Sequence, residues 1–428
     1  MKLGKEEEII IEGKREIKSK LYSTKEENKK LKNLYEIQLF KGEPEKIWVG
    51  KFSNDGKYFA TGGHSGVIKI WEILLNSNNT NKTELNNKSN IINNLNFFQE
   101  DAFKIYSEHN GDITDIAWSN KNYNLLVSVS VDYCAILWDI NLNNYVNIYK
   151  HDSIVASVSF FPYFNNDNND NILNFEYNDF FITGGFDKKI RFWSINSYEK
   201  PFKYIFENEY ITSLNFLPNG NLIVAGSSDG KISLYDINNL RYLYSFKCRN
   251  KQGKFSKGTK ITNIIFKNIN ECIISTNDSR ISYMNINDGS LIKKFKGHLN
   301  EQGIIKVNYD DNYNIIISAS EDEFVYLWDI NNNDYIIKEF RCEYFKPFKD
   351  NKEFATYSEM VNENLLREYN NKLRKISNNI FAKNIIVNTS INGNIQVCVN
   401  FEFFCIKRIV LLKGKKNFYS FIFPFFFT

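Results

Sequence analysis

Apolar and polar residues alternate most clearly over residues 109–140, HNGDITDIAWSNKNYNLLVSVSVDYCAILWDI. Three short alternating runs lie within about thirty residues and are separated by polar turns. Runs of this length and period predict three antiparallel strands that follow one another as a meander. A His precedes the first predicted strand, an Asp stands in the turn before the third, and a Trp lies near its end.

The same arrangement returns in two further parts of the chain, residues 151–195 and residues 296–330. In each, a His lies ahead of the first run and an Asp stands in the turn before the third run. The Trp follows that Asp by six positions every time. A pattern that recurs in this way indicates a repeat protein built from copies of one small sheet.

This order of residues resembles that of WD repeats, a family whose members fold as β-propellers. The resemblance implies a hydrogen-bonded tetrad of the loop His, a second-strand hydroxyl, the turn Asp and the Trp. The His can donate to the buried Asp, and the hydroxyl can receive the donor-only Trp N–H. Each bond contributes about 1 kcal/mol net, while an orphaned buried partner costs about 1–3 kcal/mol. The implied tetrads are His109, Ser128, Asp132 and Trp138; His151, Thr183, Asp187 and Trp193; and His298, Ser318, Asp322 and Trp328.

The same residue types also make up a Ser-His-Asp catalytic triad. A catalytic set is expected once in a chain, whereas this constellation recurs around the predicted fold. We therefore interpret it as structural in every repeat.

Counting by the Trp position predicts seven blades. The residues at that position are Trp71, Trp138, Trp193, Tyr235, Met284, Trp328 and Cys398. An alternating run at residues 34–40, LYEIQLF, precedes the first blade. We expect it to pair with the last blade, because ring closure leaves no open sheet edge. The predicted fold class is all-β: a seven-bladed WD-repeat β-propeller over residues 34–400, closed by an N-terminal strand.

Several blades depart from the repeat pattern. Blades four, five and seven lack the Trp, and blade one has Ser65 at the Asp position and Glu43 at the His position. The adjacent His64 and Ser65 in GGHSG do not form the G-x-S-x-G motif of hydrolases. We interpret both as turn residues.

Composition narrows the class of protein. A net charge of +4 over 428 residues implies no general affinity for nucleic acid. The six cysteines are scattered without a C-x-x-C pair, which argues against a zinc site or a disulfide framework and fits a reducing cytosol. We recognise no signal peptide, and no apolar run reaches the roughly 18 residues of a membrane span. We expect a cytoplasmic protein without metal or cofactor.

The flanks and insertions differ in composition from the repeats. Residues 1–33 are rich in Lys and Glu and predict a frayed helix or a disordered arm. Residues 401–428 are rich in Lys and Phe, and two interpretations remain open: a segment in a membrane interface or translated AT-rich non-coding sequence. Insertions at 76–101, 163–178 and 361–379 fall in connections that emerge on one rim of a propeller. We expect the Asn-rich tracts to be disordered.

The opposite rim carries the links between blades and one strongly basic segment, residues 247–260. Its cations, with no acidic residue among them, are Lys247, Arg249, Lys251, Lys254, Lys257 and Lys260. Such a segment either binds an acidic peptide, a phosphoinositide headgroup or a nucleic-acid backbone, or is a solvated flexible loop. Turn residues expected on the same rim are His64, Val131, Phe186, Ser228, Asn277 and Glu321. Trp48 is either an exposed recognition residue or part of the core.

Within this class the chain resembles the WD repeat-containing protein 44 family over about residues 34 to 400. The resemblance is carried by EKIWVGKFSNDGKYFATGG, by HNGDITDIAWSNKNYNLLVSVSVD, and above all by the basic segment followed by KITNIIF and TNDSRISYMNI. It implies a Rab-GTPase effector in endosomal recycling. That family binds Rab through a long extension ahead of the propeller, which we do not expect here, so Rab binding itself does not follow.

These observations predict a non-catalytic protein–protein interaction scaffold, an adaptor in intracellular vesicle and endosomal trafficking. Its expected partners are proteins, including a small GTPase or a trafficking complex, and no specific nucleic acid. The alternative is a phosphoinositide- or membrane-surface-binding adaptor that uses residues 247–260. We expect a monomeric propeller that is cytoplasmic or peripheral on endosomal membranes. An enzyme is not expected, because no metal-ligand cluster, phosphate-binding Gly loop or isolated acid/base pair stands out from the repeats.

Overall fold

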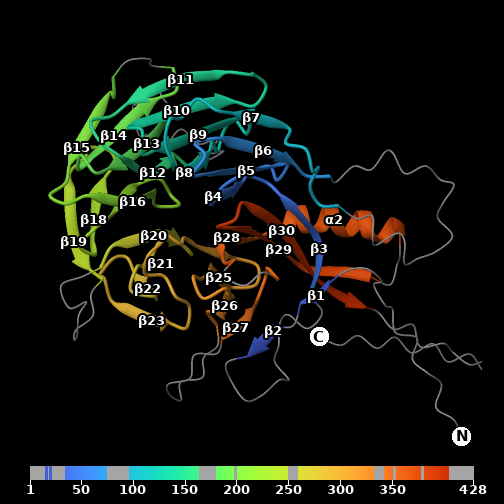
Figure 1. Cartoon of the computed structure of the whole chain (residues 1–428). Coiled ribbons are helices and arrows are strands. Elements are labelled where there is room, and N and C mark those ends of the chain that lie inside the picture. The colour runs from blue at the N-terminus through green and yellow to red at the C-terminus, as the bar shows by residue number, and fades with distance from the viewer. Residues whose placement is uncertain are drawn as a thin grey trace, which may run out of the picture.

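The structure is a computed structural model that describes residues 15–17, 19–21, 34–74, 96–162, 180–196, 200–248, 259–331, 342–349, 353–376 and 380–403. For residues 15–17, 19–21, 342–344, 375–376, 380 and 401–403 only the backbone is described. The strands form seven antiparallel sheets arranged in a ring (Figure 1). This architecture confirms the predicted seven-bladed propeller.

Blades one to four each consist of four strands in simple order. Blade one contains β4 (Ile47–Phe52), β5 (Tyr58–Gly63), β6 (Ile68–Glu72) and β7 (Lys104–Tyr106). Blade two contains β8 (Ile113–Trp118), β9 (Leu125–Ser130), β10 (Cys134–Asp139) and β11 (Tyr145–Lys150). Blade three contains β12 (Val155–Phe160), β13 (Phe180–Gly185), β14 (Lys189–Ser194) and β15 (Lys203–Phe206). Blade four contains β16 (Ile211–Phe216), β17 (Leu222–Ser227), β18 (Lys231–Asp236) and β19 (Tyr242–Lys247).

Blade five has four strands, and blades six and seven each have five. Blade five contains β20 (Ile261–Phe266), β21 (Glu271–Thr276), β22 (Arg280–Asn285) and β23 (Leu291–Phe295). Blade six contains β24 (Val307–Asp310), β25 (Ile315–Ala319), β26 (Val325–Asp329), β27 (Cys342–Phe345) and β2 (Ser19–Leu21). Blade seven contains β28 (Ala355–Met360), β29 (Ile380–Ser390), β30 (Asn394–Phe403), β3 (Leu34–Lys41) and β1 (Arg15–Ile17).

The ring closes as predicted, because β3 pairs antiparallel with β30 of blade seven. Six residues of the N-terminal segment are also in strands: β1 pairs with β3, and β2 pairs with β27. The sequence analysis expected a frayed helix or a disordered arm there, and for these six residues that prediction is wrong. An outer strand offers a row of unpaired backbone groups that a further strand can satisfy. The rest of residues 1–33 and residues 404–428 lie outside the described part of the chain.

Apolar side chains pack mainly between neighbouring blades. One buried cluster lies at each of the seven junctions, including the junction between blades seven and one. Blades are therefore covered on both faces, and all six residues of β9 are buried, including its two Ser residues. The largest buried side chains are the Trp residues of the repeats, Trp71, Trp138, Trp193 and Trp328.

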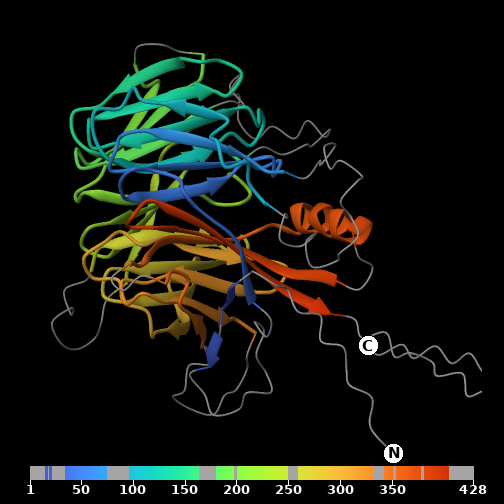
Figure 2. The same ribbon diagram turned by 45° about the vertical axis from the view of Figure 1, so that its right-hand side comes forward.

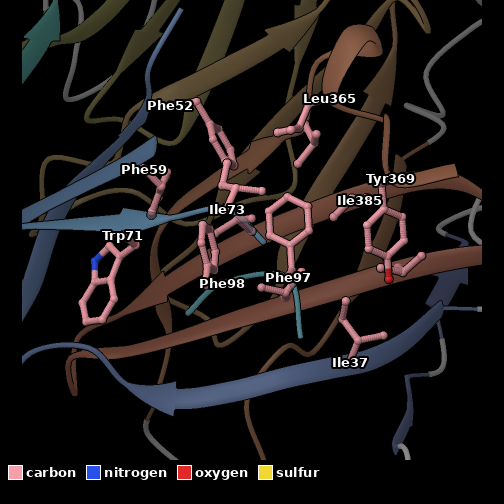
Figure 3. Close-up of a cluster of buried hydrophobic side chains, with 14 of the residues drawn as sticks. Ile37, Phe52, Phe59, Trp71, Ile73, Phe97, Phe98, Leu365, Tyr369 and Ile385 are labelled. Atoms are coloured by element: carbon pink, nitrogen blue, oxygen red, sulfur yellow. The ribbon is translucent and has the colours of Figure 1, made fainter. Parts of the chain in front are cut away.

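The insertion of blade seven contains a helix that the sequence analysis did not predict. Helix α2 (Glu363–Ile376) lies beside the ring on one side (Figure 2) and turns Leu365 and Tyr369 toward it. Figure 3 shows these side chains against Phe97 and Phe98, which come from the end of the blade-one insertion. Two of the three predicted insertions therefore meet where the ring closes. Residues 75–95 and 163–179 lie outside the described residues.

Candidate functional site

The tetrad of blade two is complete. His109 Nδ1 lies 2.8 Å from Oδ2 of Asp132, and His109 Nε2 lies 2.8 Å from the Ser128 hydroxyl. Trp138 Nε1 donates to the same hydroxyl at 2.9 Å. Burial raises the pKa of Asp132, but hydrogen bonds from His109 and from backbone N–H groups outweigh it, so the pKa lies below its ordinary value. The four residues join loop, turn and two strands within one blade.

Blade three forms only part of its tetrad. The Thr183 hydroxyl meets His151 Nε2 and Trp193 Nε1, both at 2.8 Å. His151 Nδ1 lies 3.0 Å from the carbonyl of Tyr149, and Asp187 instead accepts a hydrogen bond from Arg191. The predicted His151–Asp187 contact is therefore wrong, because a third-strand guanidinium takes the carboxylate. Burial, with Arg191 nearby, lowers the pKa of His151 to about 4.

The tetrad of blade six does not form, so this prediction is wrong. Trp328 Nε1 donates to the Lys296 carbonyl at 3.2 Å, and the Ser318 hydroxyl donates to the Ala319 carbonyl. Asp322 accepts from the Tyr326 hydroxyl at 2.6 Å, since this third-strand phenol lies within reach and competes for the carboxylate. Both ring nitrogens of His298 are buried without a partner, and burial lowers its pKa to about 4.

Blade one uses a carboxylate where other blades have a His. Trp71 Nε1 still donates to a second-strand hydroxyl, Thr61, at 3.0 Å. Glu43 is 1 % exposed, and its Oε2 lies 3.5 Å from Nζ of Lys69. Burial raises the pKa of Glu43 to about 7, although Lys69 and the nearby Thr61 and Ser65 hydroxyls oppose this rise. The substitutions at these two positions thus place a buried, titratable acid in blade one.

Blade four replaces the tetrad with a different set that the sequence analysis missed. Tyr235 stands at the Trp position, and its hydroxyl donates to Oε1 of Glu207 at 2.6 Å. Asp229 accepts from the Ser227 hydroxyl at 2.6 Å and pairs with Lys247 at 2.6 Å. One sequence feature could have indicated this replacement. Glu207 lies in the loop ahead of blade four, at the place where a complete repeat has its His.

Trp48 and His64 lie together on the rim that carries the links between blades. Trp48 Nε1 donates to Asp112 Oδ2 at 3.0 Å, and His64 Nδ1 lies 2.9 Å from Asp112 Oδ1. Trp48 is half-buried and His64 is exposed. Nζ of Lys46 lies 5.6 Å from the centre of the Trp48 ring, a cation–π distance. Trp48 is therefore neither a fully exposed residue nor a core residue, but is held by the neighbouring blade.

A second aromatic group on this rim joins blades three and four. The rings of Phe186 and Tyr210 stack with centroids 5.3 Å apart, and Nζ of Lys188 lies 5.2 Å from the Tyr210 ring. Tyr210 is 45 % exposed. Val131, the corresponding turn residue of blade two, is half-buried. We call Phe186, Lys188 and Tyr210 the aromatic rim patch.

Only the two ends of the basic segment are described. Lys247 pairs with Asp229, and burial lowers the pKa of Lys260 below its ordinary value. Lys247 is therefore already paired within the propeller, and Lys260 is half-buried. Arg249, Lys251, Lys254 and Lys257 lie outside the described residues.

A cavity of about 430 Å³ occupies the centre of the ring and is lined by the innermost strand of every blade. Polar side chains around it bind the next blade: Asn263 Nδ2 donates to the Val307 carbonyl at 2.8 Å, and Asn308 Nδ2 donates to the Ser358 carbonyl at 2.9 Å.

One ion pair in the cavity crosses the ring. Lys306 Nζ of blade six lies 2.5 Å from Asp115 Oδ1 of blade two, and these blades are not neighbours. Asp115 Oδ2 also accepts a hydrogen bond from the Ser157 hydroxyl at 3.0 Å. The sequence analysis did not identify this ion pair, since its partners are 191 residues apart and belong to no local motif.

Two features are absent from the described residues. They contain no group of three or more His, Cys, Asp or Glu side chains placed to hold a metal ion. Within the same residues, no helix is long and apolar enough to cross a membrane.

Comparison with protein families identifies the repeats. The family described as "WD domain, G-beta repeat" matches residues 35–72, 101–139 and 289–329. The "Anaphase-promoting complex subunit 4 WD40 domain" family matches residues 189–268.

Three curated relatives each match between 66% and 71% of the chain. WD repeat-containing protein 44 of Xenopus laevis is 29% identical over 322 residues, which cover 66% of this chain and 33% of the relative. An uncharacterized WD repeat-containing protein of Schizosaccharomyces pombe is 27% identical, covering 71% and 51%. The 2-deoxy-glucose resistant protein 2 of Saccharomyces cerevisiae is 24% identical, covering 70% and 42%. The chain thus spans between a third and about half of the length of these relatives.

Proposed function

We propose that this chain, a seven-bladed WD-repeat β-propeller, is a non-catalytic scaffold that binds protein partners on the rim carrying the links between its blades. The observation that carries this proposal is the aromatic rim patch. Stacked Phe186 and Tyr210 present apolar area at low entropic cost, and Lys188 adds a cation beside them. Surfaces of this composition suit protein recognition.

The geometry around the patch supports the same proposal. Short turns and links are held by hydrogen bonds to the blades, such as the Phe186 N–H to the Ile154 carbonyl at 2.9 Å. A closed ring positions such loops rigidly, so a partner binds them without first ordering them. The tetrad His, Asp and Ser residues are committed to structure in blade two, which supports a scaffold over a hydrolase.

The finer proposal is an adaptor in vesicle and endosomal trafficking, cytoplasmic or peripheral on endosomal membranes. It is supported by the similarity to WD repeat-containing protein 44, which extends over 322 residues. A small GTPase or a trafficking complex is the partner this similarity suggests. The chain is similar to only 33% of that relative, so partners that bind elsewhere on the relative are not implied.

The test is affinity capture with the wild-type chain and with Phe186→Ala/Tyr210→Ala, which removes the two stacked rings. We expect the variant to lose the captured partners and to melt close to wild type, because both side chains lie on the rim. The matched control is Tyr242→Ala, which removes a similarly exposed ring from an outer strand. A double variant that retains every partner overturns the proposed binding rim.

The basic segment is tested separately with Lys251→Glu/Lys254→Glu/Lys257→Glu. If these cations bind an anionic surface, the variant loses sedimentation with liposomes containing a phosphoinositide. Wild-type binding should also weaken with salt, since exposed charges are screened over about 8 Å at physiological ionic strength. If the triple variant sediments with these liposomes at low salt as wild type does, residues 247–260 are excluded as the lipid-binding segment.

A further inference from the structure

The link between blades five and six contains a preformed site for an anion. The backbone N–H groups of Glu301, Gln302 and Gly303 all donate to one oxygen, Oε1 of Glu321, at 3.1, 2.9 and 2.7 Å. Three successive N–H groups that converge on one point form a concavity that binds anions. We call these three donors the 301–303 nest. Glu321 reaches it from the turn between β25 and β26.

We propose that the 301–303 nest binds an acidic side chain of a partner polypeptide, and that Glu321 occupies it until that partner arrives. The proposal rests on the proposed scaffold function and names the chemistry of one partner contact. The nest lies on the rim that links the blades, where such a partner would dock. The present occupant shows which chemistry fits, since a carboxylate already satisfies all three donors.

The nest is held in shape by contacts that do not involve the Glu321 carboxylate. The Leu299 N–H donates to the Ser320 hydroxyl at 2.8 Å, and the Glu321 N–H donates to the Leu299 carbonyl at 2.9 Å. The Asn300 N–H donates to the Ser279 hydroxyl at 3.0 Å. Because the link is fixed to its neighbours just ahead of the nest, the three donors stay aligned when one carboxylate replaces another.

The surroundings of the nest favour a peptide over a small free anion. Leu299 and Ile304 stand on either side of it along the chain and are 37% and 43% exposed. They offer apolar contact to residues that flank an acidic side chain in an extended segment. Gly303, the last donor, has no side chain to obstruct the approach, and a Cβ placed there would lie 3.3 Å from Oε1 of Glu321.

The same link also holds unused hydrogen-bonding capacity. Both ring nitrogens of His298 and Oδ1 of Asn300 have no partner, although the two residues are only 3% and 0% exposed. Unpaired buried groups of this kind disfavour the arrangement that contains them. A side-chain rotation of His298 or Asn300 on binding can pair them without moving the three backbone donors of the nest.

Glu321 makes the site selective. A ligand must replace charge-assisted hydrogen bonds from three N–H groups, and only another anion supplies bonds of similar strength. A neutral side chain would leave the donors with weaker acceptors. Glu323, two residues further on, belongs to a different contact because it pairs with Lys346 at 2.6 Å.

The experiment uses the full chain and a short capped peptide with one Glu between two Leu residues, titrated by calorimetry. We expect Glu321→Ala to bind this peptide about tenfold more tightly than wild type, because no internal carboxylate competes. The same peptide with Gln in place of Glu should show no such gain. Glu323→Ala is the matched control and should bind as wild type does.

Glu321→Gln covers the case in which Glu321→Ala disturbs the link, because Gln keeps an acceptor of the same length. It should bind the Glu peptide more tightly than wild type and less tightly than Glu321→Ala. Equal binding of the Glu peptide by wild type and both Glu321 variants overturns the proposal, as does equal gain with the Gln peptide. Partner capture that survives in Phe186→Ala/Tyr210→Ala overturns the aromatic rim patch as the partner contact and leaves the calorimetric comparison at the nest as it stands, so the two failures are distinguishable.

Discussion

Two His residues at equivalent positions of the repeat have opposite environments. His109 uses both ring nitrogens, one with Asp132 and one with Ser128. His298 is equally buried and uses neither. A His at this position therefore does not stabilise every blade equally. It stabilises a blade only where hydrogen-bond partners are available to its ring nitrogens. In blade six, Tyr326 has already taken Asp322.

Replacing each of these His residues by Phe should separate the two cases. His109→Phe removes one hydrogen-bond partner from the partly buried Asp132 carboxylate and one from the buried Ser128 hydroxyl, and should cost about 1–3 kcal/mol in total. His298→Phe removes two unpaired buried nitrogens at similar volume and should be neutral or stabilising. Urea denaturation measures both. A His298→Phe variant that is destabilised as much as His109→Phe contradicts the assignment of His298 as unpaired.

Glu43 should make stability depend on pH. Its pKa of about 7 in the folded chain lies above the ordinary value of 4.5, so the folded state holds the proton more tightly. The stability from this group is fully present below about 4.5 and is lost as the pH rises through about 7. The side chain of Glu43→Gln stays neutral, so its contribution to stability does not change with pH. Thermal melts across this range should therefore show wild type losing stability relative to Glu43→Gln as the pH rises.

At the scale of elements, the end of the blade-one insertion is tied to the strand that closes the ring. Gln38 of β3 accepts hydrogen bonds from the backbone N–H groups of Phe97 and Phe98 at 3.0 and 2.9 Å, and donates to the Phe98 carbonyl at 2.9 Å. The Phe97 ring then lies 5.9 Å from Tyr369 of α2. One buried amide thus joins the insertion to the closing strand, and the Phe97 ring, shown beside Tyr369 in Figure 3, joins the insertion to the helix.

Gln38→Ala should destabilise the chain by about 3 kcal/mol, because it leaves three buried backbone groups without a partner. Leu39→Ala is the control on the same strand, since Leu39 is 45% exposed and should cost little. Differential scanning calorimetry compares the two. Equal melting temperatures for both variants would show that the insertion finds other partners when Gln38 is removed.

The sequence predicted the blades well because their signal is local. Alternation, turn residues and Trp spacing lie within about thirty residues, and each describes one sheet. Helix α2 was missed because its segment, ENLLREYNNKLRKI, is rich in Asn and polar residues, although Leu365, Tyr369 and Leu373 lie four apart on its buried face. The Asp187 contact was missed because its competitor, Arg191, faces it only after the third strand pairs.

The contacts that join blades were not predictable from the sequence for a related reason. Lys306 and Asp115, and Asn308 and Ser358, meet only when the ring is assembled. Their positions follow from which blades lie side by side or face one another, and no repeat motif encodes that. The 301–303 nest was not predictable either. The sequence identifies Glu321 only as a turn residue, and its role follows from the three N–H groups that the fold places around its carboxylate.

At the scale of the whole molecule, stability depends on closing the ring. Strand β3 pairs with β30 from Leu34 with Asn400 to Lys41 with Asn394 and contributes Leu34 and Ile37 to two buried clusters. Deleting residues 34–41 would leave β30 without its partner strand, detach β1 from the sheet and remove Gln38 as well. The polar side chains around the central cavity join neighbouring blades, but they cannot replace a missing strand.

We expect the deletion of residues 34–41 to lower the melting temperature sharply and to increase aggregation, because β30 gains an open edge. Substituting only the exposed Leu39 leaves the edge paired and serves as the control. Light scattering during a thermal melt reports both effects. A deletion variant that melts and scatters as the full chain does would mean that another segment closes the ring.

The pairing of β3 with β30 also bears on how the chain is made. Gln396 of β30 donates to Glu36 of β3 at 2.6 Å, across a separation of 360 residues. At a synthesis rate of about 5–20 residues per second, β3 leaves the ribosome roughly 20–70 seconds before its partner exists. During that interval blades one to six can assemble while the edge of β3 that later pairs with β30 stays open, within reach of chaperones and of other nascent chains. The synthesis of β30 thus ends the exposure of this edge of β3.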